Sequence, residues 1–188
     1  MQKSVLNYLN QIVREKPDKM AYSDGTEGMT FREVYRYSRS IGSFLHEKGI
    51  YKKPIVVFMR KSPQEVTAFF GVIAGGCFYV TIDEEIPSGS IQLILDNVRS
   101  PLIICDEATA DIAGKFQVED CEIVLYDRMI QTPIDDGALD RIYRRAIDTD
   151  PIYIVFTSGS TGIPKGVAAC HRSVIDYIEQ LSEALHFN

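Results

Sequence analysis

The stretch PIVVFMRKSPQEVTAFFGVIAGGCFYVTID, residues 54–83, holds one strand–helix–strand unit. Residues 54–59 are apolar without alternation, which is typical of a strand buried on both faces of a parallel sheet. Ser62, Pro63 and Glu65 form a helix-start signal, in which Ser62 caps the helix and the Glu65 carboxylate is expected to reach back to the cap. The first half of the stretch therefore predicts a buried strand followed by a helix.

The second half of this stretch ends the helix and begins another strand. Gly75 and Gly76 follow apolar residues at helical spacing and predict the helix end. Residues 77–82 are rich in aromatic and β-branched side chains, which indicates a second strand. Two strands joined through a helix form a βαβ unit, so the segment favours the α/β class.

The same alternation extends to both sides of the unit. Upstream, Thr30 and Glu33 form a capping box that predicts a helix over residues 31–48. Downstream, we expect strands at 102–105, 122–126 and 152–156, and helices after Pro87 and over 172–185. Residues 127–150 have a weak pattern and mixed charges, and we expect a solvated surface excursion there. The predicted fold is α/β, a mostly parallel sheet flanked by helices.

Composition excludes several classes of function. The chain has 188 residues, a size that fits one domain, and a formal net charge of −6. A protein with a net negative charge does not attract nucleic acid or an anionic membrane through its overall electrostatic field, so we expect neither as a partner. Four cysteines and three histidines show no metal-ligand spacing, and no metal ligand is assigned. The sequence offers no secretory signal and no convincing membrane span, which makes the cytoplasm the expected location.

One segment, TSGSTGIPKG at residues 157–166, has a composition unsuited to packing: three glycines, four hydroxyls and one lysine. Glycines let backbone N–H groups approach a ligand, hydroxyls add donors and the ammonium adds a charge, a combination that suits a phosphate chain. It is not a Walker A loop, because Lys165 lies between Pro164 and Gly166, and no G-x-G-x-x-G fingerprint occurs. The alternative interpretation is a Gly/Ser hairpin turn between Phe156 and Val167 on a plain α/β scaffold.

The order of the residues favours the phosphate-binding loop over the simple hairpin turn, because it resembles the motif of a known family. The sequence YIVFTSGSTGIPKGV, residues 153–167, closely resembles the phosphate-binding signature of the adenylate-forming (AMP-binding) enzymes. Two other segments are similar to motifs of the same superfamily, MTFREV at 29–34 and IAGGCFYVTID at 73–83. In the latter, Ala74 replaces a usual lysine and Thr81 a usual proline.

The resemblance implies a two-step reaction. A carboxylate attacks the α-phosphorus of ATP to give an acyl-adenylate and pyrophosphate, and a thiol then takes the acyl group. ATP and Mg²⁺ are implied as cofactors. The resemblance implies that seven loop residues bind the departing phosphates, namely Thr157, Ser158, Gly159, Ser160, Thr161, Gly162 and Lys165. No catalytic residue is assigned.

The resemblance also implies what the chain is. Residues 1–188 are expected to be the amino-terminal portion of an adenylation domain, inactive alone, with bare edges that favour self-association. The Gly-Gly-x-x-Tyr-Val-x-Ile-Asp spacing is closer to amino-acid-activating enzymes, either nonribosomal peptide synthetases or D-alanine carrier-protein ligases. An amino acid and a carrier protein with a phosphopantetheine thiol are then the expected partners. The alternatives are a fatty or aryl acyl-CoA synthetase and a non-catalytic or split ATP-binding module.

Three residues near the loop are interpreted as structural. His171 closely follows the loop and is expected to begin the next helix and not to act in catalysis, since the substrate carboxylate needs no base. Tyr153 and Phe156 are expected to be core aromatics and not to stack on a nucleotide.

Overall fold

The computed structural model describes residues 2–116, 118–157 and 164–185. The helices are α1 (Leu6–Glu15), α2 (Phe31–Glu47), α3 (Pro63–Ala74), α4 (Ser88–Val98), α5 (Glu107–Ala113), α6 (Tyr126–Met129), α7 (Asp136–Arg145) and α8 (His171–Leu185). The strands are β1 (Met20–Ser23), β2 (Gly28–Thr30), β3 (Pro54–Phe58), β4 (Phe78–Thr81), β5 (Leu102–Cys105), β6 (Glu122–Leu125), β7 (Pro151–Thr157) and β8 (Lys165–Cys170).

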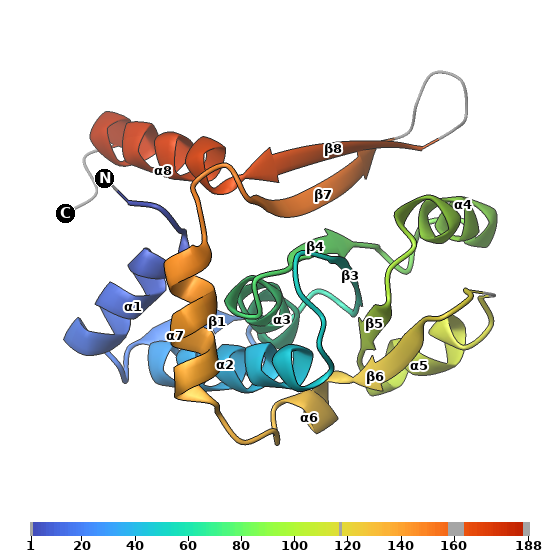
Figure 1. Cartoon of the computed structure of the whole chain (residues 1–188), viewed down its shortest axis with the longest axis horizontal. Coiled ribbons are helices and arrows are strands. Elements are labelled where there is room, and N and C mark those ends of the chain that lie inside the picture. Colours follow the sequence, from blue (N-terminus) through green and yellow to red (C-terminus); the bar gives the residue numbers. More distant parts are fainter. Residues whose placement is uncertain (1, 117, 158–163, 186–188) are drawn as a thin grey trace.

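Six of these strands form one sheet in the order β6-β5-β3-β4-β7-β8, and β1 and β2 form a separate antiparallel pair. The pairs β6–β5, β5–β3, β3–β4 and β4–β7 are parallel, whereas β7 and β8 are antiparallel. Figure 1 shows the β7–β8 hairpin and α8 along one side of the molecule, with α2 and α6 toward the other and α7 running between the two sides. The predicted α/β fold with a mostly parallel sheet is confirmed.

The central strand β3 shows why its sequence does not alternate. Ile55 and Val57 belong to a core cluster shared with α2 and α3, while Val56 and Phe58 belong to a second cluster shared with α4. All four side chains are at most 2% exposed. Because helices cover both faces, these four consecutive positions of β3 are all buried, as a continuous apolar run predicts.

The residues at the starts of α2 and α3 make capping hydrogen bonds that the sequence predicts. The Thr30 hydroxyl accepts a hydrogen bond from the Glu33 N–H at 3.3 Å, and the Glu33 carboxylate accepts one from the Thr30 N–H at 2.8 Å, which completes the expected capping box. Ser62 caps α3 by accepting from the Glu65 N–H at 3.1 Å.

The expectation that Glu65 reaches back to the cap of α3 was wrong. The Glu65 carboxylate instead accepts a hydrogen bond from the Thr81 hydroxyl at the end of β4, over 3.4 Å. The neighbouring strand offers a donor that the sequence signal could not include, so Glu65 joins α3 to the sheet.

The segment expected to be a solvated surface excursion, residues 127–150, is mostly exposed, but much of it is helical and parts of it are anchored to the core. This segment contains all of α6 except its first residue and the whole of α7, and α7 packs against α2. Met129, Ala138 and Leu139 are at most 3% exposed. The charged residues of α7 lie on its solvent side, and a narrow apolar side next to them is enough to anchor the helix.

Several further elements have no counterpart in the sequence predictions, namely α1, β1, β2, α5, α6 and β8. The helix expected over residues 172–185 is α8, and it begins at His171. Within the described ranges, no helix is long and apolar enough to cross a membrane.

Candidate phosphate-binding site

The predicted phosphate loop connects the two strands of a β-hairpin. β7 and β8 pair from Pro151 opposite Cys170 to Thr157 opposite Lys165, and the loop joins the strands beyond the latter pair (Figure 1). The hairpin that was weighed as an alternative is therefore present, and it frames the loop. Of the seven predicted binding residues, Thr157 and Lys165 are described, whereas Ser158, Gly159, Ser160, Thr161 and Gly162 lie outside the described residues.

Thr157 and Lys165 form the last described pair of the hairpin. They lie opposite one another, and the Thr157 hydroxyl donates to the Lys165 carbonyl oxygen at 3.4 Å. Both residues are exposed. Among the described residues, no acid forms an ion pair with the Lys165 ammonium. A hydroxyl and a cation thus stand together at the mouth of the loop, as an anion site requires.

The hairpin places the loop beyond the carboxyl end of β7. Since β7 runs parallel to β4, the loop begins on the edge where the parallel strands end, which is where open α/β sheets bind ligands. Lys61 and Asp83, which follow β3 and β4, form an ion pair of 2.8 Å there. The hydrogen bond from Lys61 lowers the pKa of Asp83. Sequence reasoning did not select Lys61, although a cation soon after a buried strand is a visible signal.

Glu65 adds a half-buried carboxylate near this edge. Its burial raises the pKa of Glu65 to about 7, and the negative charge of Asp83 contributes in the same direction. The Thr81 hydroxyl, which donates to Glu65, opposes the increase in pKa.

The three residues interpreted as structural lie in packed surroundings. The Tyr153 ring lies 5.7 Å from the Tyr79 ring, and Phe156 packs on the cluster that contains Val80. His171 is 4% exposed and is the first residue of α8, as expected.

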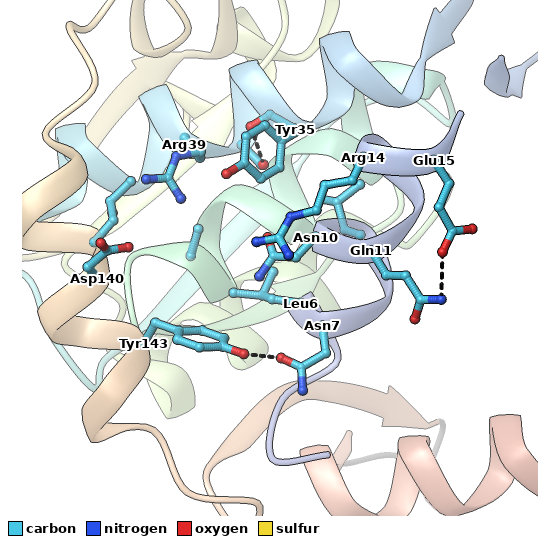
Figure 2. A pocket seen from close by; sticks show the side chains of 14 residues that line it. Leu6, Asn7, Asn10, Gln11, Arg14, Glu15, Tyr35, Arg39, Asp140 and Tyr143 are labelled. Atoms are coloured by element: carbon cyan, nitrogen blue, oxygen red, sulfur yellow. Dashed lines mark hydrogen bonds between the residues drawn. The ribbon is translucent and has the colours of Figure 1, made fainter. Parts of the chain in front are cut away.

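A separate hollow of about 610 Å³ lies between α1, α2 and α7 (Figure 2). Its wall carries Arg14, Arg39 and Asp140, and the Tyr143 hydroxyl donates to the Asn7 side chain across one end. None of its lining residues belongs to β7 or β8. The hollow is therefore not part of the phosphate-binding site.

In the part of the chain that the structure describes, no group of three or more His, Cys, Asp or Glu residues is placed to hold a metal ion. The four cysteines are free thiols.

The family model of the AMP-binding enzymes matches residues 9–187. The chain belongs to the AMP-binding enzyme family. A D-alanine--D-alanyl carrier protein ligase of Staphylococcus aureus strain MRSA252 is 30% identical over 95% of this chain and 34% of its own length. CymA of Salinispora arenicola strain CNS-205, described as a probable non-canonical nonribosomal peptide synthetase, is 34% identical over 91% of this chain and 2% of its own length. The chain thus spans about a third of the ligase and a small part of the synthetase.

Among solved structures, that of VinN has a similar fold. It superposes with a TM-score of 0.81 over 100% of this chain and 51% of VinN, at 21% identity. VinN has also been solved with L-aspartate and with 3-methylaspartate. At this identity the likeness shows a shared fold.

Proposed function

We propose that this chain supplies the phosphate-binding loop of an enzyme that activates an amino acid with ATP. The observation that carries the proposal is the β7–β8 hairpin. It presents Thr157 and Lys165, whose ammonium has no ion-pair partner among the described residues, at the mouth of a Ser/Thr/Gly loop with the family signature. The role proposed for the loop is to bind the β- and γ-phosphates of ATP and to hold them as they leave.

The chemistry follows from charge. An oxygen of the amino-acid carboxylate bonds to the α-phosphorus, the bond from that phosphorus to the bridging oxygen breaks, and pyrophosphate departs with the electron pair. Negative charge therefore grows on the phosphates that the loop holds. Lys165 would offset it by its ammonium, Thr157 by its hydroxyl, and Ser158, Gly159, Ser160, Thr161 and Gly162 by N–H and O–H donors.

We expect Mg²⁺ to bind through the phosphates of ATP and not through a set of ligands on this chain. The described residues contain no ligand set for a metal, so no step is assigned to one. When bound with ATP, Mg²⁺ would neutralise phosphate charge, and it remains an expectation from the family resemblance.

The substrate class and the acceptor are the finer part of the proposal. We propose an α-amino acid as substrate and the phosphopantetheine thiol of a carrier protein as acceptor, in the whole protein that contains this chain. The thiol sulfur would bond to the carbonyl carbon of the adenylate, with AMP leaving and the thiol proton released to solvent. The similarity to a D-alanine--D-alanyl carrier protein ligase supports this choice over an acyl-CoA synthetase.

The test is amino-acid-dependent ATP–pyrophosphate exchange by the whole protein, with a panel of amino acids and of fatty and aryl acids. We expect exchange with one or a few amino acids and its loss in Lys165→Ala. Exchange driven only by fatty or aryl acids would replace the amino-acid proposal with an acyl-CoA synthetase. Lys115→Ala, an exposed lysine near the end of α5, is the matched control and should retain activity.

A further inference from the structure

The base of the β7–β8 hairpin lies at the end opposite the loop. There the segment that enters β7 is bonded to the segment that leaves β8: the His171 N–H donates to the Asp150 carbonyl at 3.2 Å, and the Arg172 N–H donates to the Asp148 carbonyl at 2.7 Å. The Arg172 guanidinium also pairs with the Asp148 carboxylate at 2.6 Å. These contacts close the base of the hairpin but do not attach it to the rest of the molecule.

Two side chains contribute to that attachment. The Lys52 ammonium, before β3, pairs with the Asp150 carboxylate at 2.8 Å, and the His171 ring reaches the start of α1. The His171 Nδ1 accepts a hydrogen bond from the backbone N–H of Val5 at 3.3 Å, across 166 positions of the chain. Val5 directly precedes α1 and is 8% exposed, and His171 is 4% exposed. In this buried place the unprotonated Nδ1 is the acceptor that the Val5 N–H needs, because a buried N–H without a partner is costly.

Packing supports the same junction. Val5, Ile73, Ile152 and Ile175 form a small buried cluster that brings together the start of α1, the end of α3, β7 and α8. His171 lies beside it, at the step from β8 into α8.

Besides the packing of Phe156 on the cluster that contains Val80, the outer half of the hairpin is held through its base. β7 pairs with β4 only at Tyr79 opposite Tyr153 and Val80 opposite Ile154. Beyond Ile154, the described strand partner of β7 is β8 alone, and residues Lys165 to Ala168 of β8 are exposed. A small rotation at the base would therefore displace Thr157 and Lys165 at the far end.

We propose that His171 is a positioning residue for the phosphate loop. By joining the start of α1 to the base of the β7–β8 hairpin, its ring sets the direction in which the hairpin presents Thr157 and Lys165. The consequence for phosphate affinity rests on the proposed function, whereas the consequence for hairpin geometry does not.

Three variants distinguish the effect of the hydrogen bond between Val5 and His171 from the effect of packing around the His171 ring. His171→Leu keeps apolar bulk and removes the acceptor. His171→Asn restores an acceptor, since its side-chain oxygen and the imidazole Nδ1 are both bonded to Cγ. Val5→Pro removes the donor from the other side without touching the ring, and the Val5 φ of −60° suits proline.

The readouts are the backbone amide signals of Thr157 and Lys165 in the folded chain and the dissociation constant for pyrophosphate. We expect His171→Leu and Val5→Pro each to move both signals and to weaken pyrophosphate binding by about two- to tenfold, the range of one ordinary hydrogen bond. The double variant should do no more than either single one, because the same contact is removed twice. His171→Asn should restore the original values.

Unmoved Thr157 and Lys165 signals, or effects of the two single variants that add in full, would overturn the proposal. Moved signals with unchanged pyrophosphate affinity would overturn the part that concerns the loop. If the unaltered chain binds no pyrophosphate, the proposed function fails, and the amide signals alone still decide the role of His171.

Discussion

At the scale of single residues, Thr81 and Glu65 show how one departure from the family motif changes local chemistry. Thr81 stands where the family motif has proline, and its hydroxyl donates to the Glu65 carboxylate. Proline has no such donor. Burial nonetheless dominates and raises the pKa of Glu65 to about 7, so the folded chain holds a proton there that the unfolded chain releases near pH 4.5.

This difference predicts a pH dependence of stability. Because the folded state binds the extra proton, the contribution of Glu65 is complete below about pH 4.5 and is lost as the pH rises through about 7. Glu65→Gln should raise the free energy of unfolding by about 1 kcal/mol at pH 8, a value reduced for the exposed half of the side chain, and change it little at pH 4. Urea unfolding at both pH values measures this, with the exposed Glu183→Gln as control. An equal effect of Glu65→Gln at pH 4 and pH 8 would contradict it.

At the scale of elements, the contact between α2 and α3 depends on the absence of a side chain. A Cβ placed on Gly71 of α3 would lie 2.5 Å from the Ile41 Cβ of α2. Such a distance forces the helices apart. We expect Gly71→Ala to lower the free energy of unfolding by about 1–3 kcal/mol, the usual cost of overpacking.

The matched control is Gly89→Ala in the first turn of α4, where a Cβ meets nothing within 4 Å. Alanine is a better helix former than glycine, so this variant should be neutral or more stable by up to about 1 kcal/mol. Thermal unfolding of both variants tests the contrast. Equal stability changes at the two sites would show that the α2–α3 contact is not tight.

The same scale shows how much of the fold was predictable. Elements with a cap and a broad apolar pattern were predicted nearly to the residue, as in α2, where Thr30 and Glu33 mark the start. α7 was missed because Ala138 and Leu139 form a narrow apolar side among charged residues. β8 was missed because Lys165 to Ala169 are mostly small and exposed, so the partner β7 defines this strand more than its own pattern does.

The candidate site was predictable in part. Residue type and order, with the family resemblance, selected Thr157 and Lys165 as candidates, and the structure adds that they pair across a hairpin. The link between Val5 and His171 could not be predicted, since it joins positions 166 residues apart through a backbone N–H that carries no side-chain signal.

At the scale of the whole molecule, the β7–β8 hairpin and α8, which lie along one side of the molecule (Figure 1), carry exposed apolar side chains. Val155 and Val167 of the hairpin are 40% and 58% exposed. On α8, Tyr177, Leu181 and Leu185 are 65%, 38% and 55% exposed. β8 is the last strand of the sheet in the described residues, so its outer edge adds unpaired backbone groups to this apolar side.

We therefore predict that the isolated chain self-associates through this side. Light scattering should give a mass above that of one chain that falls on dilution. Val167→Lys, which places a charge on the edge strand, should shift the mass toward one chain, while Leu93→Lys on α4, 50% exposed in the unaltered chain, should not. A monomeric mass for the unaltered chain at every concentration would contradict the prediction.

The central claim is that the β7–β8 hairpin presents a phosphate-binding loop, and calorimetric titration of this chain with pyrophosphate tests it most directly. The account predicts binding that Lys165→Ala weakens by about 1.5–3 kcal/mol, the range for a hydrogen bond from a charged donor, and that Lys115→Ala leaves unchanged. Equal affinity in Lys165→Ala and the unaltered chain, or no binding by the unaltered chain, would contradict it.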